Sequence, residues 1–160
     1  GRTGGPHERQ FCYTNEAFIR QVAQDARDYF DGKPLKGSQI ALGDYFAVVP
    51  LDNAYWCQCD ECQKQLAIDE GNIRGEHFNC GTATHYLWTF VNNVAKEVKK
   101  THPDKKIAAL SYHVYAYLPK DIQLEDNISV APCLHPRNYW APKMKENELA
   151  FYKDLSLIHI

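Results

Sequence analysis

The stretch Phe46-Ala-Val-Val-Pro-Leu-Asp-Asn-Ala-Tyr-Trp-Cys-Gln-Cys-Asp-Glu-Cys62 decides the fold. Its apolar run, Phe46 to Val49, stops at Pro50, and Asp52 and Asn53 follow. A short run of β-branched and aromatic residues that ends in Pro and Asp/Asn predicts a buried strand leaving a sheet. Open α/β sheets and α/β barrels place reactive side chains just past the carboxyl ends of their strands. The segment after Val49 is therefore the candidate site.

Outward from this stretch, apolar residues recur every three or four positions in two segments, which predicts amphipathic helices. The first helix begins at Glu16, after the capping residues Thr14 and Asn15. The second helix is capped by Thr84 and ends before His102-Pro103. Two further apolar runs, Lys106–Ser111 and Asn127–Pro132, predict strands. The remaining expectations are a strand tail at 10–13, a loop at 35–44 and short helices at 63–68 and 146–153.

Strands that alternate with amphipathic helices predict a parallel sheet with right-handed crossovers. Each expected strand is followed by a polar, aromatic or cysteine-bearing loop, which favours an active face at the strand carboxyl ends. A complete barrel of this kind needs about 200–250 residues. We therefore expect an α/β fold, a partial (β/α)8 TIM-like barrel over residues 1–154, as a fragment with about four parallel strands. Residues 155–160 resemble a translated adapter sequence, and we expect them to be a non-native tail.

The net charge and the lengths of the apolar runs argue against nucleic-acid and membrane partners. The chain has 160 residues, 18 basic and 20 acidic, and a formal net charge of -2. This balance does not attract nucleic acid or a membrane surface, and no apolar run approaches the roughly 20 residues of a membrane span. The start, Gly-Arg-Thr, lacks Met and a signal-peptide core, so we expect a processed or cut N-terminus.

Asp52 is the candidate catalytic residue. A carboxylate at a strand end, beside Tyr55 and Trp56, suits a general acid in glycoside hydrolysis. That chemistry uses two carboxyl groups, about 5 Å apart for retention and roughly 6.5–9.5 Å apart for inversion, and the sequence does not identify the second. The alternative is an Asp that caps the following turn.

The spacing Cys57-x-Cys59-x-x-Cys62 is the candidate metal site. Three thiolates and a fourth ligand, such as Cys12, Cys80, Cys133 or a His, can hold a structural zinc tetrahedrally. The alternatives are disulfides between loops and free buried thiols.

The other candidate site residues follow the predicted strands. Arg137 can clamp a substrate carboxylate, and Trp140 can stack on a sugar. A lone His or Arg in a loop is otherwise an ordinary solvated residue. The substrate-binding candidates are Asn53, Trp56, Tyr112, His113, Tyr115, His135, Arg137, Asn138 and Trp140.

Several motifs resemble one family. These are Val49-Pro-Leu-Asp-Asn53, Trp56-Cys-Gln-Cys-Asp-Glu-Cys62, Phe90-Val-Asn-Asn-Val-Ala95, Thr101-His-Pro-Asp-Lys105, Ala109-Leu-Ser-Tyr112 and Cys133-Leu-His-Pro-Arg-Asn138. In this order they resemble the bacterial family catalogued as domain of unknown function 4838, whose members look like glycoside hydrolases similar in outline to hexosaminidase and α-glucuronidase barrels.

The resemblance implies an exported, carbohydrate-active protein that acts on a polysaccharide or glycan and needs no cofactor for catalysis. Asp52 matches the acidic residue that related barrel glycosidases carry after their fourth strand. Those enzymes usually have Asp-Glu or Glu there, whereas this chain has Asp52-Asn53, so their mechanism does not transfer directly. The other interpretations are a non-catalytic carbohydrate-binding domain and a structural domain held by zinc or disulfides.

Overall fold

The computed structural model describes residues 9–72 and 80–156. Its centre is a four-stranded sheet in the order β1-β2-β3-β4, formed by β1 (Ala41–Leu42), β2 (Tyr45–Ala47), β3 (Lys106–Ser111) and β4 (Ile128–Pro132). Strands β2, β3 and β4 are parallel, with Phe46 opposite Ile107 and Ile107 opposite Ile128. The predicted mixed α/β fold with parallel strands is confirmed for these three strands.

The edge strand β1 departs from the predicted all-parallel sheet, because it pairs with β2 in the antiparallel sense. The predicted loop at 35–44 contains this strand, and Gly43 and Asp44 form the turn that follows it. Gly43 has a φ of 57°, the left-handed conformation that two-residue hairpin turns require and that glycine adopts without strain. A strand of two residues carries no periodic pattern that a sequence can reveal.

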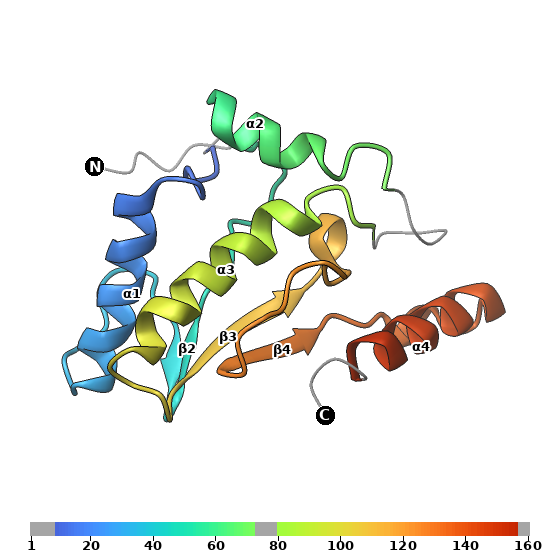
Figure 1. Cartoon of the computed structure of the whole chain (residues 1–160). Helices are drawn as coiled ribbons and strands as arrows, with labels where there is room; N and C mark the ends of the chain where they lie inside the picture. Colours follow the sequence, from blue (N-terminus) through green and yellow to red (C-terminus); the bar gives the residue numbers. More distant parts are fainter. Residues whose placement is uncertain (1–8, 73–79, 157–160) are drawn as a thin grey trace.

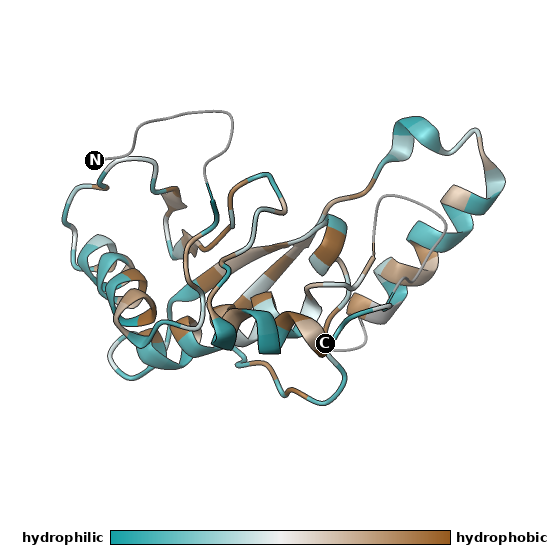
Figure 2. Ribbon diagram, turned by 90° about the horizontal axis from the view of Figure 1, so that it is seen from above, coloured by the Kyte–Doolittle hydropathy of each residue, from teal (hydrophilic) through white to brown (hydrophobic). Residues whose placement is uncertain are grey.

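The two long helices are those that the periodicity predicts. Helix α1 covers Glu16–Phe30 and helix α3 covers Thr84–Lys99. The helices α1 and α3 pack against each other on one side of the sheet (Figure 1). Along β3, alternate residues are buried, which places Ile107, Ala109 and Ser111 in the core. The hydrophobic colouring of Figure 2 runs through the strands, and the outer side of α1 is hydrophilic.

The shorter elements complete the arrangement. Helix α2 covers Asp60–Ala67 and helix α4 covers Pro142–Ser156, and both are longer than the predicted segments. Single 3₁₀ turns follow β3 at His113–Tyr115 and β4 at Pro136–Asn138. None of the helices in the described part of the chain combines the length and the apolar run that a bilayer crossing needs.

Three further expectations concern the strand tail at 10–13, the partial barrel and the C-terminal tail. No strand forms at 10–13. The backbone of Gln10 makes one hydrogen bond, to the carbonyl of Tyr55, and its side chain bonds the loop after β2. The described residues form an open sheet, so the expected barrel is not seen in them. In the suspected tail, Leu155 is buried in the core, and residues 157–160 lie outside the described part.

Candidate functional site

Four cysteine sulfurs meet at one point of the structure. The Sγ atoms of Cys12, Cys57, Cys59 and Cys62 all lie within 4.8 Å of one another. The Sγ atom of Cys12 is 3.7 Å from that of Cys59 and 3.6 Å from that of Cys62. All six cysteines of the chain are free thiols. The four sulfurs are thus a compact thiol cluster, the donor set of a tetrahedral metal site.

Three segments bring the cluster together. Cys12 lies just before α1, Cys57 lies in the loop after β2, and Cys59 is the N-cap of α2, which places Cys62 in the first turn of that helix. Cys12 is 47 residues from Cys59, so no local pattern distinguishes it from the other candidate fourth ligands. Cys80 and Cys133 do not belong to the cluster.

The thiols of the cluster ionise unequally. Hydrogen bonds from the backbone N–H of Cys62 and from the neighbouring thiols lower the pKa of Cys59 to about 7. The backbone N–H of Cys59 favours ionised Cys57, but burial and the adjacent thiols outweigh it and raise the pKa of Cys57 to about 12. Burial also raises the pKa of Cys12. Closely packed thiolates repel one another, and a divalent cation between them removes that obstacle.

Hydrogen bonds from Gln10, in the N-terminal segment, also hold the loop after β2. The Nε2 atom of Gln10 donates to the carbonyl oxygens of Leu51 and Asn53 at 2.6 and 2.7 Å, and its Oε1 atom accepts from the Leu51 N–H at 3.1 Å. Gln10 is 5% exposed. The loop after β2 is therefore held at its start by Gln10 and at its end by the cysteine cluster.

Asp52 lies in this loop and is exposed. Its Oδ1 atom accepts a hydrogen bond of 3.3 Å from the hydroxyl of Tyr112, the first residue after β3. Burial, followed by the nearby Asp52 carboxylate, raises the pKa of Tyr112. The side chain that bonds the following turn is that of Asn53, whose Oδ1 atom accepts from the Tyr55 N–H at 3.0 Å. The structure thus joins Asp52 to Tyr112 across the ends of β2 and β3.

The other predicted substrate-binding residues are spread over several environments. Trp56 packs edge-on against Tyr86 with ring centroids 5.6 Å apart, and Tyr115 is buried with 5% exposure. His113 follows β3 and has a φ of 47°, a conformation that is uncommon outside glycine. After β4, Asn138 is half-buried and Arg137 is exposed. Trp140 is 83% exposed.

Two buried carboxylates were not identified from the sequence. Glu148 of α4 is 7% exposed. Its carboxylate accepts a hydrogen bond from the backbone N–H of His135 and makes another with the Nδ1 atom of the same residue, both at 2.7 Å. Asp69 is 2% exposed and bonds the Nδ1 atom of His85 at 2.7 Å, while Asp121 bonds the Nε2 atom of that ring at 2.7 Å. Neither carboxylate directly follows a strand, so the strand-end criterion missed both.

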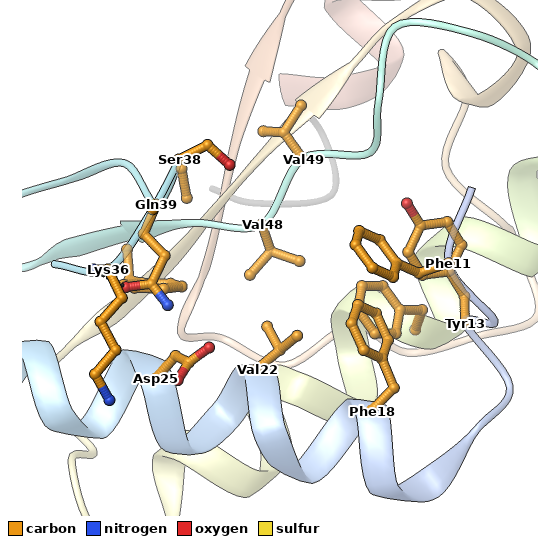
Figure 3. A pocket seen from close by; sticks show the side chains of 14 residues that line it. Phe11, Tyr13, Phe18, Val22, Asp25, Lys36, Ser38, Gln39, Val48 and Val49 are labelled. Atoms are coloured by element: carbon orange, nitrogen blue, oxygen red, sulfur yellow. Dashed lines mark hydrogen bonds between the residues drawn. The ribbon is translucent and has the colours of Figure 1, made fainter. Parts of the chain in front are cut away.

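A cavity of about 400 Å³ lies apart from these groups, between α1 and β2. One end is lined by apolar side chains, including Phe11, Phe18 and Val48, and the other end by polar ones, including Asp25 and Lys36 (Figure 3). The lining residues are different from the predicted site residues. Lys36 lies 3.7 Å from Asp28, whose carboxylate also pairs with Lys33 at 2.8 Å.

Comparisons with known proteins agree with the family resemblance of the motifs. No curated protein and no solved structure shows significant similarity to the chain. One family model, described as Domain of unknown function (DUF4838), matches residues 2–156, nearly the whole sequence. The chain therefore belongs to the DUF4838 family of domains.

Proposed function

We propose that Cys12, Cys57, Cys59 and Cys62 bind one structural Zn²⁺ ion. The supporting observation is the arrangement of the four sulfurs, with separations of 3.6 and 3.7 Å from Cys12 to Cys62 and Cys59. A tetrahedral centre with Zn–S bonds of about 2.3 Å places its sulfurs about 3.8 Å apart. These two sulfur–sulfur separations therefore differ by only a few tenths of an ångström from those of a tetrahedral zinc site.

The donor set favours zinc in a structural role. Soft thiolates select zinc over magnesium and calcium, which prefer oxygen ligands. Four protein ligands fill the tetrahedron and leave no position for water or substrate, as structural zinc sites do. The ion fastens the N-terminal segment to the loop after β2 and to α2. Its function is to hold the end of the sheet from which Asp52 projects.

The metal content of two matched variants tests this proposal. In Cys12→Ser the cluster loses one ligand, whereas in Cys80→Ser it keeps all four. We expect the wild-type chain and Cys80→Ser to retain one zinc per chain after reducing purification and dialysis. Cys12→Ser should lose zinc, because a missing ligand weakens the site. Equal zinc retention by Cys12→Ser contradicts the proposal. Disulfides, the alternative use of these thiols, would appear as a loss of titratable thiols without bound metal.

A second proposal concerns the strand ends, where we propose that the chain is part of a carbohydrate-active protein. The favouring observation is the hydrogen bond between Tyr112 and Asp52, which joins a carboxylate and an aromatic residue at the ends of neighbouring parallel strands. In this proposal Asp52 acts as the acid or orients substrate, and exposed Trp140 contributes a stacking face for a sugar. The substrate is a polysaccharide or glycan, and the protein is exported.

The partial barrel belongs to the same proposal. Strands β2, β3 and β4 are parallel neighbours, as in a barrel. On the face opposite the helices, Ala108 of β3 and Ser129 and Ala131 of β4 are small and uncharged. Leu110 and, at the start of β3, Lys106 lie on the same face. Further strands of a barrel would continue the sheet and enclose that face.

The hydrolase proposal is tested by release of reducing ends from a panel of polysaccharides. We expect the wild-type protein to release sugar and Asp52→Asn to lose turnover while keeping its fold. Asp44→Asn is the matched control, because Asp44 is an exposed acid at the opposite end of β2. Turnover that survives in Asp52→Asn contradicts the catalytic role. Glycan binding without turnover in the wild type would instead favour a non-catalytic binding domain.

A further inference from the structure

Two hydroxyl groups converge on a single sulfur of the cysteine cluster. The hydroxyl of Tyr86 donates a hydrogen bond to the Sγ atom of Cys62 at 3.1 Å. The Oγ1 atom of Thr14 lies 3.2 Å from the same sulfur and 3.5 Å from the Sγ atom of Cys12. Cys62 is the buried member of the cluster, with 0% exposure. The contacts come from two residues that are not ligands: Tyr86 of α3, and Thr14 of the segment before α1, which also carries Cys12.

The position of the Tyr86 hydroxyl is fixed by packing. Tyr86 is 1% exposed, and its ring lies 5.6 Å from the ring of Tyr13 and 5.6 Å from that of Trp56. The residue belongs to α3, the long central helix. A hydroxyl that is held on a rigid element and aimed at one sulfur is preorganised for that contact. Trp56, one of the predicted substrate-binding residues, forms part of this supporting wall.

Hydrogen bonds to Cys62 compensate part of the negative charge of the proposed metal centre. Four thiolates around Zn²⁺ carry a net charge of about -2, and burying that charge is costly unless hydrogen-bond donors compensate it. Cys62 is the ligand with the least access to water, so it depends most on donors from the protein. A hydroxyl that donates to a thiolate stabilises the charged form of that ligand. Partners of this kind orient metal ligands and tune affinity for the ion.

We propose that Tyr86 and Thr14 form the hydrogen-bonding shell of the zinc centre and set its affinity through Cys62. This inference rests on the proposed zinc function. Tyr86 then has a role in metal binding in addition to packing in the core, and Thr14 has one although it lies outside α1. Both residues position and polarise a ligand without contacting the ion.

The test compares Tyr86→Phe and Thr14→Val with Tyr13→Phe. Each of the first two substitutions removes a hydroxyl from Cys62 with little change of shape. Tyr13→Phe removes a hydroxyl from the same ring cluster, but that hydroxyl donates to Gln10 at 2.8 Å and not to sulfur. Zinc affinity is measured by competition with a chromophoric chelator. We expect Tyr86→Phe to bind zinc about 10–100-fold more weakly, with a smaller loss in Thr14→Val, and Tyr13→Phe to match the wild type.

A spectroscopic readout separates this role from a packing role. With Co²⁺ in place of zinc, the energy of the sulfur-to-cobalt charge-transfer band depends on hydrogen bonds to the thiolates. Losing the Tyr86 hydroxyl should shift this band to longer wavelength, because the sulfur electrons become easier to transfer. Unchanged affinity and unchanged bands in both Tyr86→Phe and Thr14→Val overturn the inference and leave the metal centre standing. A wild-type chain that binds neither zinc nor cobalt overturns the metal centre and this inference together.

Discussion

At the scale of single residues, Gln10 is the clearest case of a side chain that replaces secondary structure. Its amide group donates to two backbone carbonyls of the loop after β2 and accepts from the Leu51 N–H, while Tyr13 donates to its Oε1 atom at 2.8 Å. The apolar neighbours of Gln10 predict a strand tail, which the structure does not show. A polar side chain that bonds distant backbone groups leaves no periodic signature.

Substituting Gln10 should therefore destabilise the fold. In Gln10→Ala the partly buried Leu51 N–H loses its acceptor, and we expect the free energy of unfolding in urea to fall by about 2 kcal/mol. Gln24→Ala is the control, because the amide of Gln24 donates only to the exposed side of α1, at Asp28. That variant should remain within about 0.5 kcal/mol of the wild type. Equal stability of the two variants would refute the role given to Gln10.

His85 provides a pH-dependent contact at the same scale. Burial by itself lowers the pKa of His85, but hydrogen bonds to the carboxylates of Asp69 and Asp121 outweigh it and raise that pKa above its ordinary value. A histidine with a raised pKa in the folded state contributes its full stabilisation below the unfolded pKa of about 6.5. That contribution disappears as the pH rises through the folded pKa.

The stability difference between the wild type and His85→Gln should accordingly shrink as the pH rises above the unfolded pKa of about 6.5 into the alkaline range. Both proteins are unfolded in urea at saturating zinc, so that metal binding is the same in the comparison. Asp121→Asn should reduce the pH dependence as well, because it removes one of the two carboxylate partners. A difference that stays constant over this range would show that the charge of His85 does not contribute.

At the scale of elements, the helices were the predictable part. Both α1 and α3 repeat apolar residues at three and four positions over 15 and 16 residues, so their existence follows from the pattern. Strand β3 was predicted with the observed bounds, Lys106–Ser111. Strand β1 was missed because two residues carry no pattern. The start of α3 was also misread, since the hydroxyl of Thr84 donates to the Tyr117 carbonyl at 3.2 Å and does not cap the helix.

Of the two predicted capping residues of α1, Thr14 and Asn15, the structure confirms Asn15, and its contribution can be measured. The Oδ1 atom of Asn15 accepts from the Phe18 N–H at 3.0 Å. We expect Asn15→Ala to lower the free energy of unfolding by about 1 kcal/mol, and Asn15→Asp to keep most of the stability. Thermal or urea unfolding of the two variants side by side provides the measurement. If Asn15→Ala matches the wild type, the cap makes no contribution.

At the scale of the whole molecule, the candidate site shows where sequence reasoning ends. The spacing of Cys57, Cys59 and Cys62 was sufficient to predict that these three thiols act as a group, and the structure brings them together. The fourth, Cys12, joins them only because the segment before α1 packs beside α2, a contact that depends on the complete fold. The hydrogen bond from Tyr86 to Cys62 likewise depends on how α3 lies against α2. Long-range pairs of this kind have no local pattern.

Removal of zinc should affect the molecule as a unit. An ion that binds only the folded state stabilises it by about 4 kcal/mol when its concentration is 1,000 times the dissociation constant. We therefore expect a strong chelator to lower the midpoint of thermal unfolding of the reduced chain, and added zinc to restore it. The same chelator should have no effect on Cys12→Ser. An unfolding midpoint that is insensitive to the chelator in the wild type would contradict a structural zinc.

The most direct measurement is the zinc K-edge X-ray absorption spectrum of the reduced, zinc-loaded protein. The central claim is that Cys12, Cys57, Cys59 and Cys62 surround one ion. It predicts four sulfur neighbours at about 2.3 Å and no nitrogen or oxygen neighbour in the first shell. A first shell with nitrogen or oxygen neighbours at about 2.0–2.2 Å, or a chain that retains no zinc under reducing conditions, would contradict it.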